Sequence, residues 1–186
     1  NLDGQNSMST FYGTVKVHKS GFPLKPISAS FSSLTNKAEV FLKNFFDPLL
    51  ENCTFLLKGV KEFKEVFLPA CEKFDHQHHE VVCFDAKSLY TSVDIETVVD
   101  HVLKEVYRQP QLFFDEQRDK KGNLLSHPTK TDFKNFLLGV LTKFSLVRSQ
   151  IGIYRQTKGL AMGSPLSGLL ANLYLNILEQ KIVNKF

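Results

Sequence analysis

The sequence of 186 residues predicts a single α+β domain, on three observations. Short runs that alternate apolar and polar residues predict strands near the N-terminus and before residue 156. Longer stretches whose apolar residues recur at helical spacing predict helices between these strands. With 42% hydrophobic and 12% aromatic residues, the chain has the composition of a folded globular protein rather than of a disordered one.

The first half of the chain is expected to form a strand pair followed by two helices. The strands are FYGTVKV (11–17) and KPISAS (25–30), and the helices cover residues 36–52 and 58–74. Pro48 and Pro69 interrupt the helical patterns, and each is expected to kink or end its helix.

The second half is expected to alternate a strand, two helices, a hairpin and a last helix. Residues 81–84 (VVCF) form a short apolar run that predicts a buried strand, and Asp94 can cap a helix reaching about Arg108. The remaining expected elements are a helix at 132–144 capped by Thr131, a hairpin at 144–156, and a helix that starts at Ser164 and Pro165.

Positive charge is concentrated near the N-terminus. The net charge is +4, and residues 10–43 contain five lysines against Glu39 alone. A local basic stretch beside a neutral body is typical of a surface that binds anions such as phosphates, although a solvated lysine-rich face fits equally well. Lys16, Lys19 and Lys25 lie on the expected strand pair, where they could neutralise a triphosphate.

The cysteines and the hydropathy pattern bear on the compartment. The three cysteines have no metal-ligand spacing and are odd in number, so we expect buried free thiols in a reducing environment. No apolar run approaches the ~20 residues that a membrane span needs, and we therefore expect no membrane partner.

Asp85 is the first candidate for chemistry because it ends the expected strand at 81–84. A carboxylate there, together with the carbonyl of Ala86, offers the oxygen ligands that Mg²⁺ prefers. Tyr90 follows five residues later, and its ring could pack under a sugar and sense a 2′-OH. The alternative interpretation is a helix-capping Asp and a core Tyr.

The segment QTKGLAMGSPLSGLLANLYL (156–175) is the second candidate. Gly159 and Gly163 would let the backbone approach another group closely, and Ser164 would open a helix whose free N–H groups favour an anion. Gln156 ends the expected hairpin with an amide that could position a ligand. Taken as a glycine pattern alone, this segment fits a turn before a core helix about as well as it fits a binding loop.

These segments, in this order, resemble the fingers and palm of reverse transcriptases, most closely those of Penelope-like retroelements. FDAKSLYTSV (84–93) is similar to the motif A written D-V-x-S-L-Y-T-N-I, and residues 156–172 are similar to motif B. The basic strand pair is similar to the P-K-x-H-K and R-P-I finger motifs. The resemblance covers essentially the whole chain, with about 1–75 fingers-like and about 76–186 palm-like with insertions.

The resemblance implies a role for each matching residue. Asp85 would be catalytic and would bind Mg²⁺ or Mn²⁺ together with Ala86. Tyr90 would exclude ribonucleotides. The residues around the nucleotide would be Lys16, Lys25, Gln156 and Gly159, and those contacting template or primer would be Lys19, Gly163 and Ser164.

The chain departs from the family pattern in several places. Lys25 replaces the usual Arg, which keeps the charge and gives up bidentate phosphate contact. In the family, Asp85 works with two aspartates of a Y-x-D-D hairpin after the motif B helix. This sequence has no Asp-Asp pair and no Asp after Asp132. We therefore expect the rest of the palm and a thumb to belong to the same parent chain, and this stretch alone to be inactive.

The implied function is that of an RNA-directed DNA polymerase of a retrotransposon. It would transfer nucleotides from dNTP to a primer 3′-OH, with an RNA template and a DNA primer, in the nucleus or cytoplasm. Two other interpretations remain, a catalytically inactive remnant that binds nucleic acid and a folded scaffold with neither property.

Overall fold

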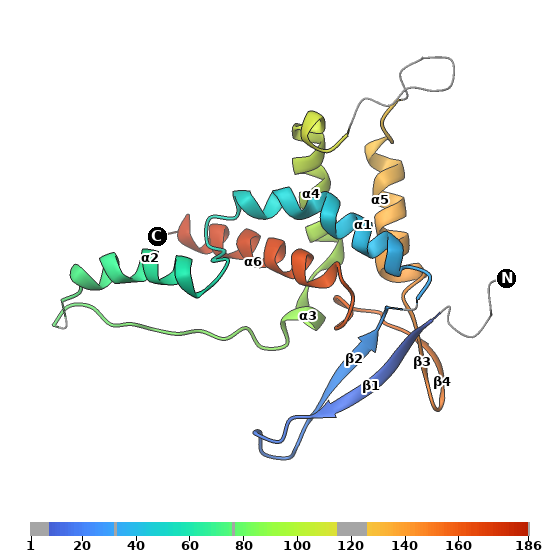
Figure 1. Cartoon of the computed structure of the whole chain (residues 1–186), viewed down its shortest axis with the longest axis horizontal. Coiled ribbons are helices and arrows are strands. Elements are labelled where there is room, and N and C mark those ends of the chain that lie inside the picture. Colours follow the sequence, from blue (N-terminus) through green and yellow to red (C-terminus); the bar gives the residue numbers. More distant parts are fainter. Residues whose placement is uncertain (1–7, 32, 76, 115–125, 186) are drawn as a thin grey trace.

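The computed structural model describes residues 8–31, 33–75, 77–114 and 126–185. Within these ranges the fold is α+β, with a mixed four-stranded sheet and six α-helices. Figure 1 shows the sheet at one end of the molecule, with α1, α4, α5 and α6 beside it and α2 extending to the side. No helix in the described ranges combines the length and apolar character that crossing a lipid bilayer requires.

Two hairpins that are distant in sequence form the sheet. The first pairs β1 (Ser9–Val15) with β2 (Leu24–Ala29), and the second pairs β3 (Leu146–Ser149) with β4 (Gly152–Arg155), both antiparallel. The strand order is β2-β1-β3-β4, and the hairpins are joined by a short parallel pairing of Ser9 with Val147 and Thr10 with Arg148. Both expected strand pairs are confirmed.

The helices expected from local capping and periodicity form close to their predicted bounds. α1 (Asn36–Phe46) passes into a 3₁₀ helix, η1 (Asp47–Asn52), at Pro48, as expected of a proline that cannot continue an α-helix. α4 (Ile95–Arg108) begins at Asp94, whose carboxylate accepts a hydrogen bond from the Thr97 N–H at 3.0 Å.

The later helix starts differ from prediction. α5 (Lys130–Leu138) is capped by Thr129 rather than Thr131, because the Thr129 hydroxyl accepts from the Asp132 N–H at 3.1 Å. A π-helical turn, η3 (Gly139–Lys143), follows α5. α6 (Ser167–Val183) begins three residues after Ser164, so the prediction of Ser164 as N-cap is wrong. Two short elements were not predicted, α3 (Leu89–Ser92) and the 3₁₀ helix η2 (Pro110–Leu112).

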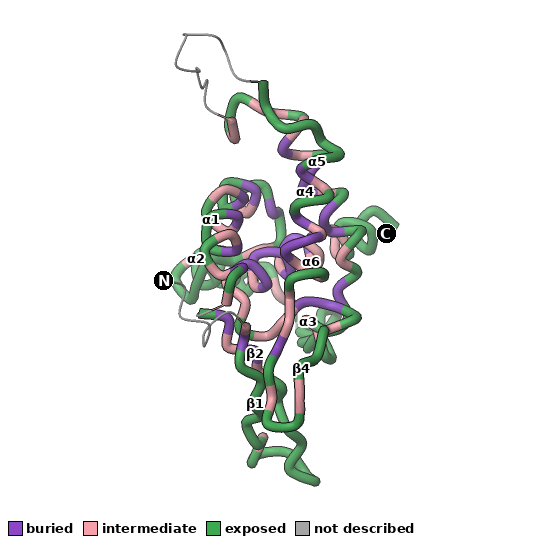
Figure 2. The backbone as a smooth tube through the Cα atoms, turned by 90° about the vertical axis from the view of Figure 1, so that its right-hand side faces the viewer, coloured by how far each residue is buried: buried purple, intermediate pink, exposed green. Residues whose placement is uncertain are grey.

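The core lies between α1, α4, α5 and α6, as the buried segments in Figure 2 show. α4 contributes most regularly, since its apolar residues at helical spacing are all fully buried. These residues are Val98, Val99, Val102, Leu103 and Val106. Full burial of an aliphatic side chain stabilises the fold by about 1.5–3 kcal/mol, so this stripe fixes α4 against its neighbours.

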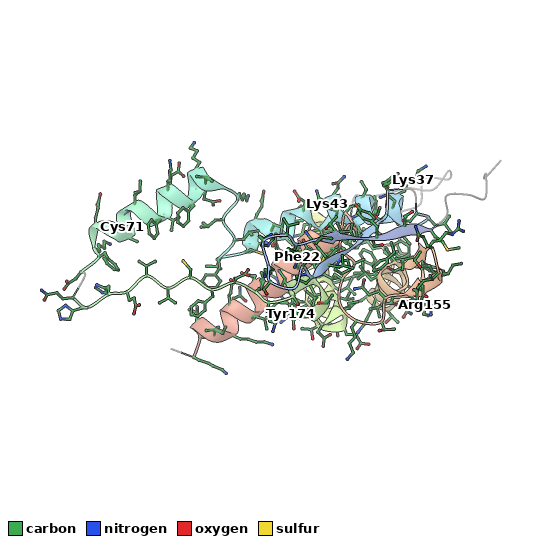
Figure 3. The ribbon with its side chains drawn as sticks, turned by 90° about the horizontal axis from the view of Figure 1, so that it is seen from below. Phe22, Lys37, Lys43, Cys71, Arg155 and Tyr174 are labelled. Carbon is green, nitrogen blue, oxygen red and sulfur yellow. The ribbon has the colours of Figure 1, made fainter. Side chains whose placement is uncertain are left out.

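α2 (Val60–Glu72) and the chain after it form the least covered part of the molecule. No residue of α2 is buried, and the helix continues through Pro69 for three more residues. Figure 3 shows α2, with Cys71 near its end, standing apart from the packed helices. Cys53 is buried, but Cys71 and Cys83 are exposed, so the prediction of buried thiols is wrong for these two because the elements that carry them are uncovered.

Candidate functional site

The loop between β4 and α6 joins three segments that the sequence singled out. The N–H of Leu160 donates to the Tyr90 carbonyl at 2.6 Å, and the N–H of Ser28 donates to the Met162 carbonyl at 2.6 Å. The Ser30 hydroxyl also donates to the Gly163 carbonyl at 3.0 Å. The loop therefore connects the end of β2 on one side to α3 on the other.

Two glycines make this junction possible. Gly159 has φ +66°, and a Cβ there would lie 2.4 Å from the carbonyl oxygen of Tyr90. Gly163 has φ +111°, and a Cβ there would lie 2.2 Å from the carbonyl oxygen of Ser28. Both positions combine a left-handed backbone with a contact that no side chain can enter. The expected close approach is confirmed, and what the glycines approach is the chain's own backbone.

A cavity of about 750 Å³ lies against this junction, between the two hairpins. Such a volume is typical of clefts that bind small ligands. Its walls carry half-exposed aromatic rings next to an arginine and an amide. The principal lining residues are Phe11, Tyr12, Tyr154, Arg155, Gln156 and Leu160. Aromatic faces beside a cationic group can stack on nucleobases, so the walls suit a nucleic-acid strand or a nucleotide.

Gln156 is held in place at the edge of this cavity. Its Nε2 donates to the Lys158 carbonyl at 2.8 Å, which fixes the amide plane. Oε1 has no hydrogen-bond partner among the described residues and remains available to a ligand. Gln156 thus lines the cavity, and its role in positioning a ligand stays a prediction.

Asp85 lies outside this cavity, on an extended and exposed stretch of chain (Figure 1, between α2 and α3). The expected strand at 81–84 does not form, and Phe84 is 94% exposed. No backbone hydrogen bond links residues 81–86 to another described segment. An apolar run becomes a strand only when a neighbour pairs with it, and the described chain provides no such neighbour.

The donors around Asp85 are too few for a complete metal site. Its carboxylate and the Ala86 carbonyl are oxygen ligands that suit Mg²⁺, which needs about six in octahedral geometry. The described residues contain no cluster of three or more Asp, Glu, His or Cys side chains arranged to hold a metal. The residues described here therefore do not by themselves fit a catalytic Mg²⁺ or Mn²⁺ ion.

Tyr90 is half-buried and packs against the helical core. A Cβ added at Gly168, in the first turn of α6, would lie 3.8 Å from the Tyr90 hydroxyl oxygen. The ring therefore lies over the start of α6, and its neighbour Thr91 contributes to the wall of the cavity. Tyr90 therefore packs as a core residue, as the alternative interpretation of the sequence expected. It does so next to the junction that the loop forms.

The three predicted lysines lie toward the free end of the first hairpin. The N–H of Lys16 donates to the Pro23 carbonyl at 2.9 Å, and the N–H of Lys19 donates to the Lys16 carbonyl at 3.1 Å. Lys25 on β2 is opposite Thr14 on β1. None of the three forms an ion pair with a described residue, and none lines the cavity. Their charges are thus free to meet an external anion.

Ser164 has a local role. Its hydroxyl accepts a hydrogen bond from the Leu166 N–H at 3.3 Å in the turn that precedes α6.

Residues that sequence reasoning missed include Phe11, Tyr12, Tyr154 and Arg155. In the sequence, these residues were marked only by the alternation of large side chains along each hairpin. That pattern could not show that the two hairpins pack side by side.

No protein-family model matches this chain, and no curated protein sequence matches it either.

Proposed function

We propose that this chain is the fingers and part of the palm of an RNA-directed DNA polymerase of a retroelement, most similar to Penelope-like reverse transcriptases. The observation that carries the proposal is the junction of residues 25–30, 90–91 and 156–163. The junction takes in Tyr90 and Thr91 of the motif A-like stretch and residues 159–163 of the motif B-like stretch, together with Ser28 and Ser30 directly after the finger-like motif, and it lies against a large cavity.

In this proposal the cavity between the hairpins receives a template base or the incoming nucleotide. Tyr12 and Tyr154 offer ring faces for stacking, and Arg155 offers a charge for the backbone. Lys16 and Lys25 neutralise phosphate charge at the end of the first hairpin, and Lys19 adds to the same basic surface. Gln156 orients the base through its free Oε1.

Catalysis in this proposal belongs to the complete protein. Bound Mg²⁺ or Mn²⁺ would supply charge stabilisation for the nucleotidyl transfer. Asp85 would hold it together with carboxylates that the described residues do not bring to that position. The reaction would join a primer 3′-OH to the α-phosphate of a dNTP and release pyrophosphate.

The second candidate function is an inactive, reverse-transcriptase-derived module that binds nucleic acid. The exposure of Asp85 and the lack of acidic neighbours around it favour this alternative for the described chain. Both candidates predict binding through the cavity and the basic hairpin, and they differ in catalysis.

Binding is tested by titrating the chain with single-stranded RNA and with dNTP. Replacing Lys16 and Lys25 by Ala is expected to weaken both interactions. For RNA, the slope of log affinity against log salt should fall by about 1.4, since each phosphate contact on a single strand contributes about 0.7. Lys61→Ala is the matched control, because Lys61 is an exposed lysine on α2 whose partner is Glu65. Equal salt slopes for the double variant and the control would contradict the assignment.

The proposed sugar gate has its own test in the complete polymerase. Tyr90→Ala is expected to raise ribonucleotide incorporation, because the bulk next to the junction is removed. If incorporation stays as low as in the unmodified protein, Tyr90 acts as a core residue and not as the gate.

A further inference from the structure

The turn of the first hairpin, residues 16–23, projects away from the packed helices (Figure 1). β1 and β2 pair as far as Val15 and Leu24, and the N–H of Lys16 then donates to the Pro23 carbonyl at 2.9 Å. Figure 2 shows that this end of the molecule is exposed almost throughout. The turn is therefore a protruding tip whose side chains face solvent.

The tip has apolar side chains that the described chain leaves uncovered. Val17 is 75% exposed and Phe22 is 64% exposed, and Leu24 is exposed beside them at the start of β2. Apolar side chains that gather at a surface commonly mark sites of interaction. The packing of the sheet does not account for these three residues, so they call for a partner outside the described chain.

Phe22 is also held in an unfavourable backbone conformation. Its φ is +45°, in the left-handed region that bulky residues rarely enter. Gly21 before it has φ +77°, which a glycine adopts without steric cost. An exposed ring gains no burial that would offset the strain at Phe22, and residues strained in this way concentrate at functional sites.

The charge around these apolar residues is positive. Lys16, Lys19 and Lys25 lie in the turn or directly beside it, and the sequence has no acidic residue between Asp3 and Glu39. None of the three lysines forms an ion pair with a described residue. A partner that complements the tip therefore has negative charge next to a flat or apolar surface.

The end of a nucleic-acid duplex offers both features together. Its last base pair exposes a flat face, and the phosphates of both strands lie beside that face. A single protruding ring can cover such a face but cannot enclose an unpaired base from two sides. Two aromatic walls for unpaired bases are found instead in the cavity between the hairpins, which Tyr12 and Tyr154 line.

We propose that Phe22 stacks on the terminal base pair of an RNA duplex whose single-stranded continuation enters the cavity between the hairpins. The inference rests on the nucleic-acid binding proposed above, and it names the substrate as a junction of paired and unpaired RNA. Lys16, Lys19 and Lys25 neutralise the phosphates next to the stacked ring. Val17 and Leu24 extend the apolar contact, as apolar side chains do where they wedge against base steps.

The hairpin sets the distance between the two parts of this site. Tyr12 lies in the wall of the cavity, and Lys16 begins the turn four residues later. Four strand residues span roughly 13 Å, at about 3.3 Å each. Nucleotides of one stacked strand rise by about 3.4 Å each, so about four unpaired nucleotides separate the duplex end from the cavity.

Fluorescence anisotropy of labelled RNA tests the proposal on the 186-residue chain. The probes are a duplex with a single-stranded overhang and the longer strand of that duplex alone. Affinity for the duplex is expected to rise as the overhang lengthens to about four nucleotides and to level off beyond that length. An affinity that does not depend on the overhang would overturn the proposed path from the tip to the cavity.

Substitution of Phe22 separates stacking from attraction to phosphate. Phe22→Asn removes the ring but keeps a residue that tolerates the left-handed backbone, so the turn should persist. It is expected to weaken the duplex with the overhang about ten-fold and to leave the single strand unchanged, whereas Phe22→Tyr should keep both affinities. Phe31→Asn is the matched control, because Phe31 is an exposed phenylalanine outside the hairpin, and it should change neither affinity.

The outcomes distinguish this inference from the proposed function. If Phe22→Asn weakens both RNAs equally, or neither, stacking on a duplex end is overturned and the proposed nucleic-acid binding stands. If the unmodified chain binds no RNA, both are overturned. An apolar and basic hairpin also suits an anionic membrane surface. Binding to vesicles of phosphatidylcholine and phosphatidylserine in equal parts, lost in Phe22→Asn, would overturn RNA as the occupant of the tip.

Discussion

Gly159→Ala is the substitution whose cost follows most directly from the structure. An alanine at φ +66° costs roughly 1–2 kcal/mol, because L-residues avoid the left-handed region. The added Cβ would also meet the Tyr90 carbonyl oxygen at 2.4 Å, where the Leu160 N–H now donates. Losing that hydrogen bond adds about 1 kcal/mol, so we expect a total destabilisation of about 2–3 kcal/mol.

Substitutions at two other glycines separate the cost of the left-handed backbone from the cost of the lost hydrogen bond. Gly21 has φ +77° with nothing within 4 Å, so Gly21→Ala should show the backbone cost alone, roughly 1–2 kcal/mol. Gly59 has an extended backbone and open space around it, so Gly59→Ala should cost only what the loss of a glycine N-cap on α2 costs, less than about 1 kcal/mol.

Urea unfolding followed by far-ultraviolet circular dichroism measures all three substitutions on the same chain. We expect the order Gly159→Ala, Gly21→Ala, Gly59→Ala, from most to least destabilised. If Gly159→Ala were no more destabilising than Gly21→Ala, the loop would not contact Tyr90 as the structure describes.

Three further predictions concern single side chains. Asp94→Ala should destabilise the fold by about 1 kcal/mol in the same urea assay, since α4 loses its N-cap, whereas Asp94→Asn should not. Burial lowers the pKa of His101, so the unfolded state binds a proton more readily than the folded state. The free energy of unfolding should therefore fall as the pH drops below about 6.5. His101→Gln should flatten this pH dependence, and an unchanged dependence would contradict the burial of His101. Cys71 and Cys83 are exposed and should react quickly with a thiol-reactive dye. Cys53 is buried and its pKa is raised, so it should react only after unfolding. Equal reaction rates for all three thiols would contradict the burial of Cys53.

The elements that the sequence predicted well depend on local signals. α4 follows from the spacing of its apolar residues and from Asp94, and both hairpins follow from alternation and turn residues. These features are determined within a dozen residues, so no knowledge of distant contacts is needed.

The elements that the sequence predicted poorly depend on distant partners. The apolar run at 81–84 has the composition of a strand, yet it lacks a pairing neighbour within the described chain. Likewise, the parallel contact between β1 and β3 joins residues more than 130 positions apart, and no local pattern indicates it. On α1, Phe41 has the helical spacing of a core residue, yet its side chain is 61% exposed.

The residues of the candidate site also fall into those that local sequence signals indicated and those that only the fold brings together. Gly159 and Gly163 were recognisable as positions of close approach from the glycine spacing, whereas their partners, Tyr90 and Ser28, were visible only in the fold. Asp85 was recognisable from its place after an apolar run, but its exposure depends on what pairs with that run.

Primer extension on an RNA template by the complete parent protein tests the proposed function most directly. We expect incorporation of dNTP that requires Mg²⁺ or Mn²⁺ and is abolished by Asp85→Asn, while the 186 residues alone extend nothing. Extension that survives Asp85→Asn, or its absence in a parent that binds template and primer, would contradict the polymerase assignment.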